Sequence, residues 1–214
     1  MVTDNSTAGT ARRGSTSKRQ IVIDTAIDVL GRQPDASIAD IAAAGGIARR
    51  TIYGHFPTRH DLIVGIAESA AADLTAIIPA RAALPTEPDR AVAALAMITW
   101  PVAGRYRALL GIGRQELGDD RVLELLAPGR DLSLALVEAG QRSGVFPAYL
   151  PPSTIVSLTD GATLGLLADA DAGNSADPAR DVAVVALVIA GLGATDAIAV
   201  VDAVTADGST PRSG

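Results

Sequence analysis

The part of the sequence richest in chemistry-bearing residues runs from Ser37 to Leu62 and reads SIADIAAAGGIARRTIYGHFPTRHDL. It contains two short apolar patterns of helical spacing, a Gly45–Gly46 pair between them, and two adjacent arginines after the pair. Arg49 and Arg50 fall near the start of the second pattern, which is the end of a recognition helix that usually meets base edges in DNA. The segment therefore predicts a helix-turn-helix that enters the major groove.

Three capping boxes and the apolar spacing indicate the helices that position these arginines. In a capping box, Ser or Thr at the start of a helix exchanges hydrogen bonds with the residue three positions later. The three pairs are Ser17 and Gln20, Ser37 and Asp40, and Thr58 and Asp61. Apolar residues at helical spacing follow each pair, so we expect helices over residues 17–31, 38–44 and 58–80. Another is expected over 48–54, after the glycine pair, because Ile52 and Phe56 lie one turn apart.

The rest of the chain also reads as helices, so the expected fold is all-α with about nine helices. The further ranges are 90–100, 103–117, 122–143, 153–170 and a helix that starts at 178. Pro101 is expected to end or kink a helix, residues 128–129 to interrupt one, and Ser153 and Asp177 to cap two. The expected organisation is a disordered basic arm over residues 1–15, a three-helix helix-turn-helix DNA-binding domain over 16–62, a ligand-binding and dimerisation domain over 63–204, and a disordered tail over 205–214.

Composition and charge agree with a folded protein that carries a small DNA-binding head. Hydrophobic residues make up 48% of the chain, and the absence of cysteine excludes disulfides and thiolate metal sites. The net charge is −6, but residues 1–62 hold 8 Lys and Arg against 6 Asp and Glu, a net of +2, and the remainder carries −8. A basic head on an acidic body is typical of DNA binding, although two excess charges alone also fit chance.

The C-terminal third predicts an association surface. The stretch VAVVALVIAGLGA is apolar on all sides, so a helix there must be covered on two sides, most simply by its own core and by a second copy of the chain. Thirteen apolar residues are fewer than the roughly 20 of a membrane span, so no membrane partner is expected. The expected dimer-interface residues are Ile155, Leu158, Gly161, Ala162, Gly165, Val185, Val188 and Leu192.

The motif AxxGGIxxxTIYGHFPTRHDL resembles the N-terminal domain of the TetR family of bacterial transcriptional regulators, over about residues 17–66. The resemblance implies that bases are read from the recognition helix and that hydroxyl, imidazole and basic side chains contact phosphates. The expected DNA-binding residues are Lys18, Ser37, Arg49, Arg50, Thr51, Tyr53, His55 and Arg59. The chain departs from the family at Ala48, where a capping Ser or Thr is common, and at Arg50, where a small residue is common.

The resemblance also implies a small-molecule effector held in the helical body. The candidate lining residues are the large or polar ones amid Ala and Leu, although each also fits an ordinary core or surface position. They are Met97, Trp100, Arg105, Tyr106, Arg114 and Phe146. No cofactor and no metal are expected.

The expected function is a cytoplasmic, homodimeric repressor that binds a palindromic double-stranded DNA operator and is released by its ligand. An activator of the same architecture is the first alternative, because polarity depends on where the operator lies. A helical scaffold or enzyme is the second, but the sequence contains no P-loop and no Cys–His pair, so no enzyme activity is expected. The first 19 residues contain no apolar stretch and predict no signal peptide.

Overall fold

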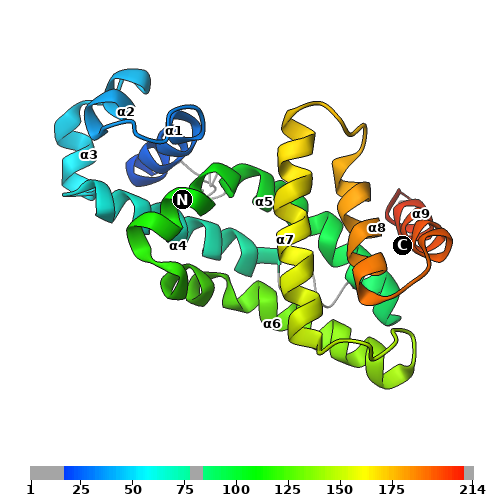
Figure 1. The fold of residues 1–214 in the computed structure, drawn as a ribbon. Helices are drawn as coiled ribbons and strands as arrows, with labels where there is room; N and C mark the ends of the chain where they lie inside the picture. The colour runs from blue at the N-terminus through cyan, green and yellow to red at the C-terminus, as the bar shows by residue number, and fades with distance from the viewer. Residues whose placement is uncertain (1–16, 78–83, 210–214) are drawn as a thin grey trace, which may run out of the picture.

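The computed structural model describes residues 17–77 and 84–209, and all its regular elements there are α-helices, as the sequence predicted (Figure 1). The helices are α1 (Lys18–Arg32), α2 (Ile38–Ala44), α3 (Arg49–His55), α4 (Arg59–Ile77), α5 (Pro88–Leu117), α6 (Asp119–Ser143), α7 (Pro152–Asp171), α8 (Pro178–Ala190) and α9 (Ala194–Ser209). The head formed by α1–α3 lies at one end of the molecule and α9 at the other (Figure 1). The predicted basic arm lies outside the described residues.

Local capping accounts for the helix starts in the head. Ser37 and Asp40 form the complete predicted capping box at the start of α2. Thr58 and Asp61 exchange the same pair of hydrogen bonds at the start of α4. At α1 only half of the predicted box forms: Ser17 accepts from the backbone N–H of Gln20, whose side chain donates to Asp24 instead.

The body contains one long helix where the sequence predicted two. Pro101 lies inside α5, which continues unbroken for 30 residues. A proline inside a helix costs about 3 kcal/mol because it removes one backbone hydrogen bond and clashes with the preceding turn. The flanking halves of α5 pack against α1 and α4 on one side of the proline and against α8 and α9 on the other, and this burial offsets the cost. Likewise α6 continues through residues 128–129, where an interruption was predicted.

Of two further predictions at helix starts, one was wrong and one was confirmed. Ser153 is the second residue of α7 and makes no capping bond; the preceding Pro151 and Pro152 fix the backbone for the first turn instead. Asp177 does cap α8, because its side chain accepts from the backbone N–H of Arg180 at 3.1 Å.

The C-terminal end of the chain differs most from expectation. The apolar run after Arg180 does not form one helix: α8 ends at Ala190, capped by Gly191 with a φ of +108°, and α9 then runs to Ser209, through the first five residues of the predicted tail. The buried side chains Ala197 and Val201 of α9 lie in one cluster with Leu187 of α8. The second side of α8, predicted to need a partner, is therefore covered in part by its own chain.

The hydrophobic core passes from the head into the body without a gap. One buried cluster joins Ile23, Ile41, Ile52 and other residues of α1–α4 to Tyr106 and Ile112 of α5. A second cluster fills the space between α5, α6, α7, α8 and α9. Because α5 contributes to both clusters, it connects the two ends of the molecule. No helix in the described part of the chain combines the length and apolar character that a membrane span requires.

Candidate nucleic-acid interface and ligand cavity

The recognition helix α3 presents one side to solvent and one to the core. Ile52 is fully buried and Phe56, which ends the helix, is 2% exposed. Tyr53 is 50% exposed, and Arg49, Arg50 and His55 are exposed as well. Thr51 is half-buried. We call these five outward residues, Arg49, Arg50, Thr51, Tyr53 and His55, the α3 surface.

Close packing behind α3 fixes its position. Gly65 of α4 lets the Phe56 ring approach so closely that a Cβ built on this glycine would lie 2.5 Å from ring atom Cε1. The Arg19 guanidinium, which also lies near Gly65, is 5.2 Å from the centre of the same ring, a cation–π contact. At the turn before α3, Gly46 has a positive φ (+61°), and Gly45 leaves room for Thr25. The α3 surface is thus held on a packed base.

The cations of the head and body differ in their partners. In the part of the chain that the structure describes, the Lys and Arg side chains without a hydrogen bond or ion pair are Lys18, Arg32, Arg49 and Arg50. All four lie in α1 or α3. The described body arginines each pair with a carboxylate, as Arg180 does with Asp202. The head therefore keeps positive charge available that the body has neutralised.

Two predicted DNA contacts have internal partners. The guanidinium of Arg59 donates to Glu116 at 2.9 Å, to the carbonyl of Pro34 at 2.7 Å and to the carbonyl of Ala36. It thereby ties α4 to the loop before α2 and to α5 with three of its five N–H groups, and a phosphate contact from Arg59 stays a prediction. The Ser37 hydroxyl, although exposed, donates to Asp40 at 2.7 Å. The hydrogen bonds from Ser37 to its carboxylate, and the nearby charge of Arg49, lower the pKa of Asp40.

A cavity of about 600 Å³ lies in the body between α4, α5, α6, α7 and α8. Its size falls in the range of small-molecule sites. Most of its described lining is aliphatic, from residues such as Leu95, Val137 and Leu167. Arg130 and Asp160 are the charged residues of that lining, and they form an ion pair with each other.

Of the predicted ligand-binding residues, some line the cavity and others do not. Trp100 and Tyr106 line the cavity. Met97 and Phe146 pack into the second core cluster and are not among the described lining residues, and Arg105 pairs with Asp24 and Asp73 instead. The side chain of Arg114 lies outside the described residues. Phe146 was predicted to line the cavity, but its ring packs directly against Gly140 and is buried in the core.

The sequence reasoning missed most polar residues of the cavity. They are Thr99, Arg130, Ser133, Thr159, Asp160 and Thr163. A signal was present: Thr159 and Thr163 lie four residues apart on α7, on the same face as the buried Ile155 and Val156. Hydroxyl residues on the buried face of an apolar helix are therefore a better indication of a polar cavity wall than large side chains are.

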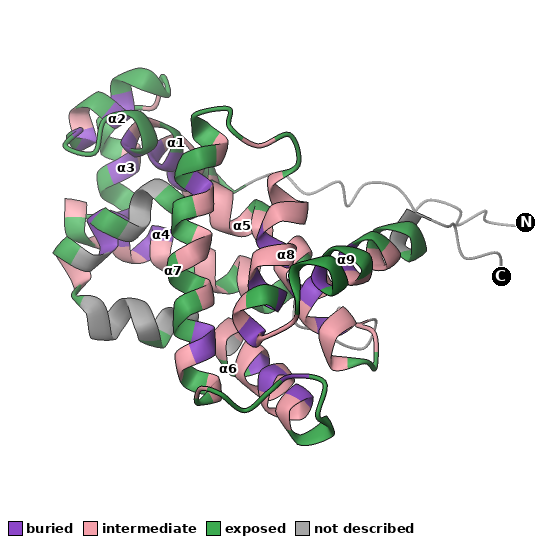
Figure 2. Cartoon of the chain, turned by 45° about the vertical axis from the view of Figure 1, so that its right-hand side comes forward, coloured by how far each residue is buried: buried purple, intermediate pink, exposed green. Residues whose placement is uncertain are grey.

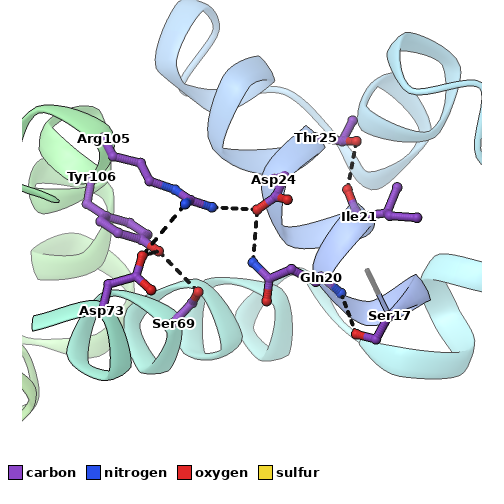
Figure 3. A network of polar contacts seen from close by, with 9 residues as sticks. All are labelled: Ser17, Gln20, Ile21, Asp24, Thr25, Ser69, Asp73, Arg105 and Tyr106. Atoms are coloured by element: carbon purple, nitrogen blue, oxygen red, sulfur yellow. Dashed lines mark hydrogen bonds and ion pairs between the residues drawn. The ribbon is translucent and has the colours of Figure 1, made fainter. Parts of the chain in front are cut away.

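A chain of polar contacts joins this cavity to α1 (Figure 3). The Tyr106 hydroxyl donates to Asp73 at 2.7 Å, and because this uses its one hydrogen, Ser69 donates to Tyr106 at 3.1 Å. Arg105 lies between Asp73, at 3.7 Å, and Asp24 of α1, at 2.5 Å. Burial raises the pKa of Tyr106 to about 12, so its hydroxyl stays protonated and keeps donating at neutral pH.

The predicted dimer residues divide into an outer and an inner set. Leu158 of α7 and Val188 of α8 are 49% and 42% exposed, and Gly161 and Gly165 of α7 are exposed as well. Exposed residues run along one side of α7 (Figure 2). The half-buried predicted residues are Ala162, Val185 and Leu192. Ile155 is 1% exposed and lines the cavity, so it is not available to a partner.

Comparison with known proteins identifies this arrangement. No family model matches the chain. Its fold aligns with the TetR-like transcriptional regulator LfrR from Mycobacterium smegmatis, in complex with proflavine, at a TM-score of 0.66 and 19% identity over 79% of this chain and 94% of that one. This is a TetR-like fold. The same TM-score, with 19% identity over 85% and 97% of the two chains, relates it to the fatty acid degradation regulator FadR from Bacillus halodurans.

In sequence, a shorter segment of this TetR-like chain matches a curated protein. It is 41% identical over 49 residues to the HTH-type transcriptional repressor LfrR of Mycolicibacterium smegmatis. The match spans about a quarter of that repressor, 26%, and 23% of this chain. These findings confirm the resemblance and the fold class predicted from the sequence. The relatives named are all transcriptional regulators, and none is described as an enzyme.

Proposed function

We propose that this chain is a DNA-binding transcriptional regulator that acts as a homodimer on a palindromic operator, as a repressor released by a small molecule. The observation that carries the proposal is that, among the described residues, the cations without a hydrogen bond or ion pair all lie in the head, with Arg49 and Arg50 at the start of α3. An arginine there can pair bidentately with guanine, and Thr51, Tyr53 and His55 can donate to phosphates. The TetR-like fold supports this orientation of the head.

Selection of bound sequences from a random duplex pool tests the activity and the operator symmetry together. The Arg49→Ala variant is expected to weaken binding to the selected duplex by about 5- to 150-fold, the range that corresponds to a lost base contact. The matched control is Arg142→Ala, which removes a cation near the far end of α6 and should leave binding unchanged. Recovery of no enriched sequence, or equal losses in the two variants, would refute the proposal.

The outer side of α7 and α8 supports the dimer. Leu158, Leu164 and Val188 are large exposed apolar side chains, and the exposed glycines Gly161 and Gly165 allow a helix of a second copy to approach closely. Two heads joined by symmetry can contact successive major grooves, about 34–36 Å apart. Leu158→Glu is therefore expected to give a monomer in sedimentation experiments, and Ile198→Glu on α9 is the exposed control that should not.

The polar chain from Tyr106 to Asp24 supports a route by which cavity occupancy affects the head. A ligand that moves the Tyr106 ring changes the Asp73–Arg105 contact and, with it, the hold on α1. A double-mutant cycle of Tyr106→Phe with Asp24→Asn on operator affinity should give a coupling of about 0.5–2 kcal/mol. The control cycle pairs Tyr106→Phe with Arg107→Gln. The Arg107 side chain donates to Asp171 of α7 and makes no bond to the head. Equal coupling in both cycles would exclude this route.

A further inference from the structure

The hydroxyl groups of the cavity share one property, which is that their hydrogens are already used. Thr99, Thr159 and Thr163 each donate to the backbone carbonyl four residues earlier, at 2.8, 2.9 and 2.8 Å. Ser133 does the same at 3.2 Å. A hydroxyl has one hydrogen and two lone pairs, so each of these groups can still accept a hydrogen bond but not donate one without breaking its present bond.

The remaining polar groups leave few donors in the cavity. Tyr106 donates to Asp73, as described above, and Asp160 is an acceptor. The donors of the described lining are the indole N–H of Trp100 and the guanidinium of Arg130, which already donates to Asp160 and Ser157. Acceptors therefore outnumber donors around the cavity, and they are contributed by α5, α6 and α7.

The charges of the lining cancel each other. Arg130 and Asp160 are paired, so the described lining offers no unpaired charge to a ligand. Transfer of a charged ligand from water into this apolar cavity would therefore be unfavourable. We propose that the cavity takes an uncharged, largely apolar molecule whose polar groups are hydrogen-bond donors, such as a phenol or an alcohol. This inference rests on the proposed role of the cavity as the effector site, and it specifies the chemistry of the effector.

Four probes of nearly the same shape test the inference on the purified full chain by calorimetry, without DNA. They are para-hydroxybiphenyl, para-methoxybiphenyl, para-biphenylcarboxylate and para-biphenylmethylammonium. The phenol is expected to bind about five- to tenfold more tightly than its methyl ether, which has the same ring system but no donor. Both should bind more tightly than the acid and the cation.

Variants locate the preference in the cavity. The double variant Thr159→Val and Thr163→Val keeps the side-chain shape and removes two acceptors, so it should bring the phenol-to-ether ratio close to one. Thr75→Val is the matched control, because Thr75 makes the same bond to the carbonyl of Ala71 at 2.7 Å but is exposed and does not line the cavity.

Each unfavourable result has a definite meaning. Tighter binding of the acid, the cation or the ether than of the phenol overturns the inference, and so does binding of none of the four. A phenol preference that persists in the double variant also overturns it. Because no DNA is present, these results leave the proposed DNA-binding function standing, and failure of the duplex selection leaves the probe result standing.

Discussion

The close approach between Gly65 and Phe56 gives a prediction that links packing to the position of α3. In a Gly65→Ala variant, the new Cβ would lie 2.5 Å from Cε1 of Phe56, while ordinary contacts begin at 3.4 Å. The ring must therefore move by about 0.9 Å, the difference between these distances. Phe56 directly follows α3 and its N–H bonds to Ile52, so this movement shifts the end of the recognition helix.

The expected size of the effect follows from two opposed terms. Overpacking of a core lowers the free energy of unfolding by about 1–3 kcal/mol. Replacing a helical glycine by alanine raises it by about 0.5–1 kcal/mol. The net loss of unfolding free energy should be about 1–2 kcal/mol, which for a chain of this length lowers Tm by roughly 2–8 °C. The affinity for the selected duplex should fall in parallel, because α3 no longer has its native position.

Gly111→Ala is the matched control for this experiment. Gly111 lies inside α5 with no atom within 4 Å of a built Cβ, so the same substitution should raise the stability by about 0.5–1 kcal/mol. Thermal unfolding followed by circular dichroism, at one protein concentration, compares the two variants. If Gly65→Ala is as stable as Gly111→Ala, then Phe56 moves without cost and the packing argument is wrong.

Three further predictions concern single side chains. Phe146→Ala should lower the unfolding free energy by about 3–5 kcal/mol in urea titration, because its buried ring packs on Gly140; a loss below about 1 kcal/mol would contradict this. Since the pKa of Tyr106 is raised to about 12, its contribution to stability is complete below about pH 10 and is lost as the pH rises toward 12. Tyr106→Phe should remove this alkaline loss, and ultraviolet titration of tyrosinate should lose its highest transition. Because the pKa of Asp40 is lowered, its contribution is complete above the ordinary value of 3.8 and is lost as the pH falls below it. Asp40→Asn should flatten the acid side of the stability profile, and an unchanged profile would count against the Ser37 hydrogen bonds.

The head was predictable because its signals are local. Ser37 and Asp40, or Thr58 and Asp61, are three residues apart, so the hydrogen bonds that start α2 and α4 can be read from sequence alone. The break between α2 and α3 is local as well, since it falls at the adjacent glycines Gly45 and Gly46. The all-α class and the TetR-like resemblance depend on these local patterns.

The errors came from interactions between distant residues. Pro101 predicts a helix end by a local rule, but packing along both halves of α5 outweighs it. The internal bonds of Arg59 were not foreseen, because its acceptors Pro34, Ala36 and Glu116 lie 25, 23 and 57 residues away in the chain. The cavity lining combines five helices, so only a few of its residues could be selected by type. No pattern of spacing within one helix contains such information.

The core that passes from the head into α5 limits how this molecule could be recombined. Tyr106 and Ile112 fill part of the same cluster as Ile23 and Ile66, so the packing of the head continues into the body past residue 62. A chimeric biosensor that joined this head to another body at that point would lose those side chains and open a gap beneath α1. Successful grafts should carry the middle of α5 with the head, or supply residues of equal volume there. If the cavity holds the proposed effector, changing its walls is therefore a more direct way to a new ligand than exchanging whole modules.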